Sequence, residues 1–110
     1  MKVKCFLFLL FYMFSINAYA EEDKYRICFI QGYFAGEGDK FMNGLATHIS
    51  QKKGVLTEPM CSTAHQVAYK VAVKFNSTGK YDSAQDYKII KYATDFREKV
   101  NIAISSLIKY

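Results

Sequence analysis

The chain has few of the residues from which metal and catalytic sites are built. Its 110 residues include only three cysteines and two histidines. His48 and His65 stand alone, without the ligand spacing of a zinc site, so we expect no bound metal. Gly36-x-Gly38 lacks the preceding strand and third glycine of a dinucleotide loop, and there is no Gly-Lys-Ser/Thr phosphate loop. The sequence therefore predicts no cofactor.

The alternation of apolar and polar residues that is typical of strands is also missing. The chain contains no internal repeat, low-complexity tract or second domain. Glu37 and Asp39 do not suggest a catalytic carboxylate pair, because residues two apart on a helix point in different directions. We expect a single all-α domain that is not an enzyme.

The first twenty residues have the pattern of a secretory signal peptide. Lys2 and Lys4 precede an unbroken apolar stretch, residues 5–14, which is too short to span a bilayer. Ala18-Tyr19-Ala20 then provides a small-x-small cleavage site. We expect residues 1–20 to be removed and residues 21–110 to be exported to the periplasm, with no stable membrane insertion. A retained anchor is the alternative.

Two cysteines remain in the mature chain, Cys28 and Cys61, because Cys5 leaves with the leader. In an oxidising compartment a Cys28–Cys61 disulfide is the default expectation. Closing a loop of this size is worth about 3–4 kcal/mol in the chain-entropy model. That amount matters for a domain this small, which buries limited apolar surface.

Charge does not identify a partner. Without the leader, thirteen Lys and Arg remain against ten Asp and Glu, a net charge of +3. The basic residues are scattered along the chain and form no patch, which argues against nucleic-acid binding.

An amphipathic stripe runs from residue 26 to about residue 51. Its apolar members are Ile30, Phe34, Phe41, Leu45 and Ile49. Gly32, Gly36, Gly38 and Gly44 weaken a helix here, each by up to about 1 kcal/mol. Because the stripe stays in phase across the glycines, we predict one helix, bent near residues 36–38.

Two further helical segments follow the connector at residues 55–60. Ser62 or Thr63 is expected to cap the second helix, whose apolar positions recur at helical spacing up to Phe75. Asp82 or Ser83 can cap the last segment, which is either one helix or two collinear ones. The predicted fold is a small bundle of three to four helices with one disulfide.

The Gly32-x3-Gly36 spacing allows another backbone to approach closely. One interpretation is internal packing against a later helix, and the other is a self-association face. Tyr33, between the glycines, suits either, since tyrosine both fills cores and anchors interfaces.

The segment from residue 76 to residue 82 is predicted to be a polar loop between two rigid helices. It is either a simple connector or a binding element that enters a partner's cleft, with Tyr81 and Lys80 as its contacts. The candidate binding residues are Asn76, Ser77, Thr78, Gly79, Lys80, Tyr81 and Asp82.

Two cysteine-led segments resemble the Rap/Tai immunity family of type VI secretion systems. The first segment matches at Cys28, Gly32-Tyr33, Gly36 and Asp39. The second matches at Cys61, Gln66, Val67, Val71 and Phe75. The chain departs from the family at its end, which lacks the Phe-Pro-Cys motif of many members.

The resemblance implies a periplasmic inhibitor that binds a peptidoglycan amidase effector of the cysteine-peptidase type. Such proteins block the catalytic groove of the amidase with an inserted loop, often as homodimers, and protect the producing cell. The alternative is a periplasmic acid-stress chaperone of the small disulfide-bonded helical type.

Overall fold

The computed structural model describes residues 24–108, so the predicted signal peptide lies outside the described residues. Within this range the chain forms four helices and no strand, which confirms the all-α fold. The helices are α2 (Arg26–Glu37), α3 (Lys40–Lys52), α4 (Pro59–Thr78) and α5 (Ala84–Ile108). None of these helices is long and apolar enough to cross a bilayer.

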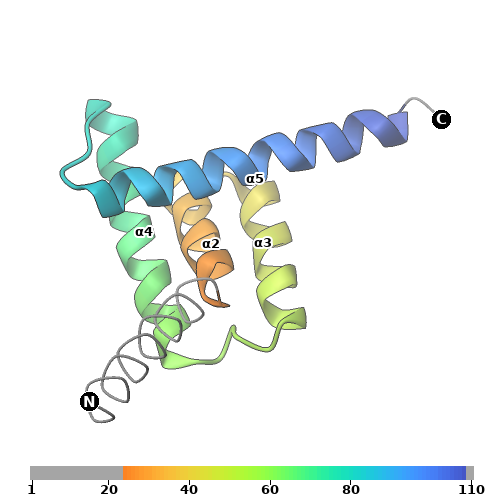
Figure 1. The fold of residues 1–110 in the computed structure, drawn as a ribbon, viewed down its shortest axis with the longest axis horizontal. Helices are drawn as coiled ribbons and strands as arrows, with labels where there is room; N and C mark the ends of the chain where they lie inside the picture. The colour runs from red at the N-terminus through yellow and green to blue at the C-terminus, as the bar shows by residue number, and fades with distance from the viewer. Residues whose placement is uncertain (1–23, 109–110) are drawn as a thin grey trace, which may run out of the picture.

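α2 lies at the centre of the bundle. α3 and α4 flank α2, and α5 crosses over the ends of these helices and continues past α3 (Figure 1). Phe34 on α2 is fully buried and packs against Phe96 on α5, with ring centroids 6.0 Å apart. Most of the core comes from small or branched side chains: Ile27, Ile30, Ala46, Ala64, Ala68, Val71, Ala72, Ile89 and Ala93.

The predicted single helix over residues 26–51 is wrong. Gly38 ends α2 in the left-handed conformation, with φ = +82°, which glycine adopts without steric cost. Asp39 then caps α3 by accepting a hydrogen bond from the Met42 amide at 3.0 Å. The chain turns at this point, and Phe41, which was expected in the buried stripe, is 61% exposed.

α4, the helix predicted to begin at Ser62 or Thr63, begins before its predicted cap and ends later than predicted. Pro59 occupies the first helical position, where its missing N–H costs nothing, so Ser62 and Thr63 lie inside the helix and not at its cap. At the other end Asn76, Ser77 and Thr78 are helical, and only residues from Gly79 onward leave the helix.

The last helix is continuous over its 25 residues, which settles the open choice between one helix and two. Ser83 caps it by accepting a hydrogen bond from the Asp86 amide at 3.1 Å. The predicted disulfide is confirmed: Cys28 and Cys61 are both buried and joined, with their Cα atoms 5.2 Å apart. It ties the start of α2 to the start of α4.

Candidate binding surface

The glycine pair on α2 is used inside the molecule. A Cβ added at Gly32 would overlap the backbone carbonyl group of His65 on α4. A Cβ added at Gly36 would lie 2.5 Å from the Tyr69 carbonyl oxygen and 2.9 Å from the Ala72 Cβ. The α4 backbone therefore covers this pair, and neither glycine is available to a second molecule. Of the two interpretations of the spacing, internal packing is correct.

The other residues that matched the family pattern have different surroundings. Tyr33 is buried on α2, with its ring edge-on to Phe34 at 6.0 Å. Asp39 is the cap of α3. Gln66 is exposed on α4, so the structure gives this residue no role in the core.

A charge cluster fixes the corner between α2, α3 and α5. Nη2 of Arg97 lies 2.5 Å from Oε1 of Glu37 and 3.8 Å from Oδ2 of Asp39. The guanidinium also lies over the Phe34 ring, 5.0 Å from its centroid. Burial raises the pKa of the nearby Tyr33 phenol, and the Glu37 carboxylate raises it further against the opposing Arg97 charge.

The expectation that Glu37 and Asp39 point apart is wrong, because the helix breaks between them. Both carboxylates face the same guanidinium, which balances much of their charge. The other carboxylate oxygen of Asp39, Oδ1, accepts the hydrogen bond from the Met42 amide that caps α3. The cluster is placed to join three helices.

A second ionic contact lies at the opposite end of α2. Nζ of Lys24, just before α2, is 3.0 Å from Oε1 of Glu58, the residue before α4. Hydrogen bonds from Lys24 and Tyr25 lower the pKa of the Glu58 carboxyl group. The connector around Glu58 is thereby tied to the rest of the fold.

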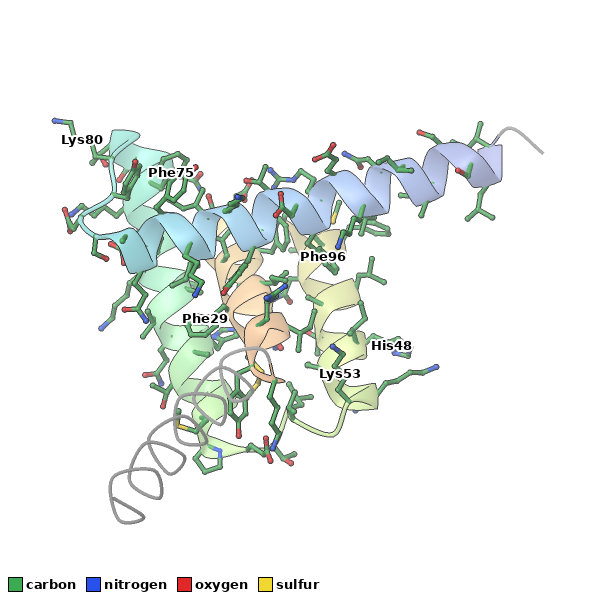
Figure 2. The ribbon with its side chains drawn as sticks, viewed as in Figure 1. Phe29, His48, Lys53, Phe75, Lys80 and Phe96 are labelled. Carbon is green, nitrogen blue, oxygen red and sulfur yellow. A yellow bond between two sulfur atoms is a disulfide. The ribbon has the colours of Figure 1, made fainter. Side chains whose placement is uncertain are left out.

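The two histidines lie on different helices, His48 exposed on α3 and His65 half-buried on α4. Figure 2 shows His48 on the outer side of α3, beneath the part of α5 that extends past the bundle. Across residues 24–108 no three His, Cys, Asp or Glu side chains are grouped so that they could hold a metal ion.

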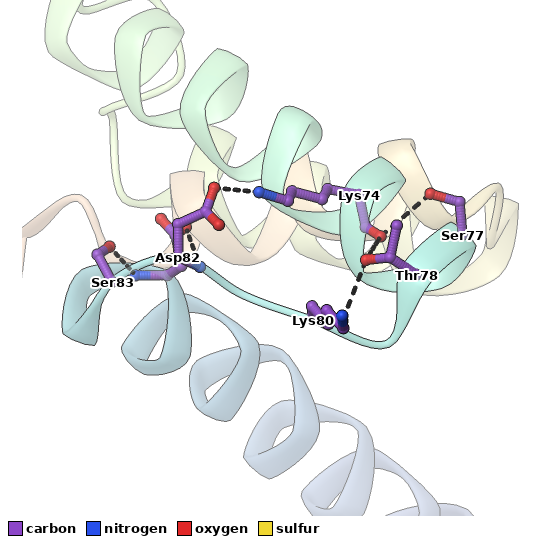
Figure 3. A network of polar contacts seen from close by, with 7 residues as sticks. Lys74, Ser77, Thr78, Lys80, Asp82 and Ser83 are labelled. Carbon is purple, nitrogen blue, oxygen red and sulfur yellow. Dashed lines mark hydrogen bonds and ion pairs between the residues drawn. The ribbon is translucent and has the colours of Figure 1, made fainter.

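The connection between α4 and α5 is shorter than predicted and well bonded. Lys74 on α4 forms an ion pair with Asp82, and the Lys80 amide donates to the Thr78 hydroxyl at 3.1 Å (Figure 3). Ser77 and Thr78 turn their hydroxyls back onto the helix, where they bond to the carbonyls of Val73 and Lys74. The contacts of Lys80 and Asp82 tie the connection to α4.

Two exposed tyrosines lie at this connection, one in the loop and one at the start of α5. The rings of Tyr81 in the loop and Tyr87 in the first turn of α5 lie 5.4 Å apart at an angle of 44°. They are 49% and 51% exposed, so each presents about half of its surface to solvent. Tyrosine buries a large area at low entropic cost, which makes such a pair suited to binding another protein.

No protein-family model, curated protein or solved structure matches this chain. Of the predicted binding segment, Gly79 to Asp82 forms the loop, whereas Asn76, Ser77 and Thr78 form the exposed last turn of α4.

Tyr87 was missed by the sequence analysis. Its position, four residues after the Ser83 cap, would have placed it in the first helical turn, but nothing in the spacing indicated contact with Tyr81. We define the aromatic loop surface as Gly79–Ser83 together with Tyr87.

Proposed function

We propose that this protein is a periplasmic immunity protein that binds a peptidoglycan amidase of the cysteine-peptidase type and sterically blocks its catalytic groove. The observation that carries the proposal is the exposed pair formed by Tyr81, in the loop between α4 and α5, and Tyr87, at the start of α5. Occlusion of a groove needs a protruding, fixed element and no catalytic group on the inhibitor.

The scaffold behind the loop supports this use. α4 is tied to α2 by the disulfide and by close backbone packing at Gly32 and Gly36. α5 packs on the same two helices through Ile89, Ala93 and Phe96. A loop anchored at both ends loses little conformational entropy on binding, which favours affinity.

The resemblance to the Rap/Tai family supplies the class of partner. The matched residues that pack, Cys28, Gly32 and Gly36 with Cys61, lie at one contact between α2 and α4. They support the scaffold, and the aromatic loop surface lies at the far end of α4. The residues that match the family thus stabilise the scaffold, and the aromatic loop surface contacts the amidase.

Co-expression tests the proposal. An open reading frame for a Cys/His amidase is sought beside this gene. Its product is exported to the periplasm with or without this protein, and lysis is followed by culture turbidity. We expect protection and a complex that co-elutes on a sizing column. Undiminished lysis with no complex would contradict the proposal.

Tyr81→Ala should weaken binding by about ten- to hundredfold, the range expected for an aromatic interface anchor. Tyr69→Ala is the matched control, because Tyr69 is exposed to a similar extent but lies in the middle of α4. Isothermal titration calorimetry measures both affinities, and circular dichroism checks that the helices are kept. Equal affinity of wild type and Tyr81→Ala would remove the loop from the mechanism.

A further inference from the structure

A small cleft opens between α2, α3 and α5. Its volume is about 290 Å³. Six side chains line it, four of them apolar and two cationic: Ile27, Ile30, Ile49, Phe96, Arg26 and Lys53. None of them belongs to the aromatic loop surface, so the proposed function leaves this cleft without a role. We call it the three-helix cleft.

The cationic and the apolar side chains lie at different ends of the three-helix cleft. α2 and α3 run in opposite directions, so Arg26 at the start of α2 lies at the same end as Lys53, just after α3 (Figure 1). Phe96 lies beneath α5, which crosses the other end (Figure 2). The cleft therefore has a positively charged mouth and an apolar inner end.

Lys53 is placed to hold a negative charge at the mouth. It follows Ile49 by four residues, so both side chains lie on the same side of α3. Lys53 is exposed, and a lysine can run its alkyl stem along apolar surface while its ammonium stays in water. The Arg26 guanidinium lies over the Tyr92 ring, 4.7 Å from its centroid, which restrains the second positive charge of the mouth.

The inner part of the cleft is formed by side chains that belong to the core or pack against it. Ile27 and Ile30 are 6% and 5% exposed and form its floor. Ile49 and Phe96 are half-buried and form its sides. An apolar group placed between them would exchange contact with water for contact with carbon, which is favourable.

The backbone of the walls offers no hydrogen bonds to a ligand inside the cleft. Within a helix each N–H group is paired with the carbonyl group four residues earlier. A peptide that entered would bring one donor and one acceptor with each residue, and leaving these unpaired costs free energy. An alkyl chain carries neither. The cleft thus suits a hydrocarbon chain better than an extended peptide.

We propose that the three-helix cleft binds a single-chain amphiphilic anion, an alkyl carboxylate, with its carboxylate at Lys53 and Arg26. Its chain lies along Ile49 and points toward Phe96. The charge of the mouth complements the carboxylate, and the inner end complements the chain. A methylene group fills roughly the volume of a water molecule, about 30 Å³, so the cleft holds a chain of about ten carbons. A bilayer phospholipid with two long chains exceeds this volume.

This inference goes beyond the proposed function and does not depend on it. The three-helix cleft and the aromatic loop surface share no residue, and the loop joins α4 to α5. Binding of the anion can therefore be measured on this protein alone, without an amidase. A protein that fails to bind any amidase could still bind the anion, and the reverse also holds.

Titration of the exported protein with decanoate, followed by NMR of isoleucine methyl groups, tests the proposal. We expect a dissociation constant of about 1 mM or lower, the strength that a ligand of this size can reach. Octanoate should bind roughly tenfold more weakly, because each buried methylene is worth about fourfold in affinity. Decyltrimethylammonium, which has the same chain length and the opposite charge, should bind at least tenfold more weakly than decanoate.

The methyl signals also locate the ligand. Decanoate should shift the methyl signals of Ile27, Ile30 and Ile49, which line the cleft. Ile102 and Ile108, near the end of α5, are 60% and 78% exposed and provide the control. Their signals should stay in place, since an exposed apolar side chain outside the cleft offers no enclosed site.

Lys53→Glu should weaken decanoate binding at least fivefold, because the reversed charge repels the carboxylate. Lys52→Glu is the matched control. Lys52 carries the same charge and is exposed at the end of the same helix, but it points about 100° away around the helix axis and does not line the cleft. Its replacement should change the affinity by less than twofold. Circular dichroism checks that both variants keep their helices.

Four results would overturn the proposal. The first is the absence of saturable shifts at Ile27, Ile30 and Ile49 up to 10 mM decanoate, including in a protein that binds phosphatidylglycerol vesicles through its cations. The second is a larger shift at Ile102 and Ile108 than in the cleft. The third is equal affinity for decanoate and decyltrimethylammonium. The fourth is an equal loss of affinity in Lys53→Glu and Lys52→Glu.

Discussion

α2 and α3 both carry glycine in mid-helix, and they use it in opposite ways. Gly32 and Gly36 on α2 lie under the α4 backbone, and the Cys28–Cys61 disulfide fixes the same contact. Gly44 on α3 faces open space beside an exposed phenylalanine. Gly44 therefore destabilises α3 relative to alanine, and no contact inside the molecule requires a glycine there. The α2–α4 contact is thus a completed interface, whereas a side chain at Gly44 would meet no other part of residues 24–108.

Removing the disulfide is the largest expected disturbance of the completed interface. Replacing Cys28 and Cys61 together with alanine should lower the free energy of unfolding by about 3–4 kcal/mol, because the 33-residue separation no longer restricts the unfolded chain. Urea denaturation followed by circular dichroism measures the change. Dithiothreitol should destabilise the wild type and leave the double variant unaffected; a reductant effect on the variant would contradict this origin.

Adding a methyl group to each glycine face compares the two helices directly. Gly32→Ala should cost about 3 kcal/mol, because the new Cβ meets the His65 backbone and α2 and α4 have to separate. Gly44→Ala should raise the free energy of unfolding by about 0.5–1 kcal/mol, since alanine favours the helix and meets nothing.

Both variants are measured by urea denaturation at the same protein concentration, below 1 µM. Opposite signs at the two positions are the expected result. A loss of stability in Gly44→Ala at this concentration would show that the outer face of α3 has an internal contact, and the contrast between the helices would fail.

Much of the fold follows from the sequence because its signals are local or covalent. The apolar spacing up to Phe75 predicted α4. Once residues 1–20 are taken as a signal peptide, the two remaining cysteines allow only the Cys28–Cys61 pairing, which the structure contains. The helix break at Gly38 was missed because the apolar stripe stays in phase across it. The pair Gly38-Asp39 was the signal for the break: glycine ends a helix in the left-handed conformation, and aspartate caps the start of the next one. The apolar stripe alone does not register this break.

The candidate site was predictable only in part. Lys80, Tyr81 and Asp82 were placed in a loop by composition. Asn76 to Thr78 looked equally polar, but serine and threonine hydroxyls can bond back to the preceding turn and remain helical. The contact of Tyr81 with Tyr87 depends on the path of the backbone between Gly79 and Ser83, which no residue pattern specifies. The exposure of residues 101–108 at the end of α5 likewise depends on the position of α3, which the sequence pattern does not specify.

The smallest expected effect concerns the ion pair that supports the completed interface at its other end. Glu58 accepts a hydrogen bond from Lys24 across the α2–α4 contact, and its pKa in the folded state is lowered from the ordinary value of 4.5. A carboxyl group with a lowered folded-state pKa stabilises the fold above its unfolded-state pKa. This contribution disappears as the pH falls through the folded-state value.

The wild type should therefore lose part of its stability as the pH falls below about 4.5, and Glu58→Gln should lose less over the same interval. The difference should be small and should shrink at 1 M salt, because the pair is accessible to solvent. Thermal melting at pH 3, 4, 5 and 7 measures it, with Asp95→Asn, an exposed carboxylate on α5, as the control. If Glu58→Gln and Asp95→Asn follow the same pH profile, the lysine contact adds nothing to the α2–α4 interface. The disulfide and the glycine packing would then account for that interface without an ionic contribution.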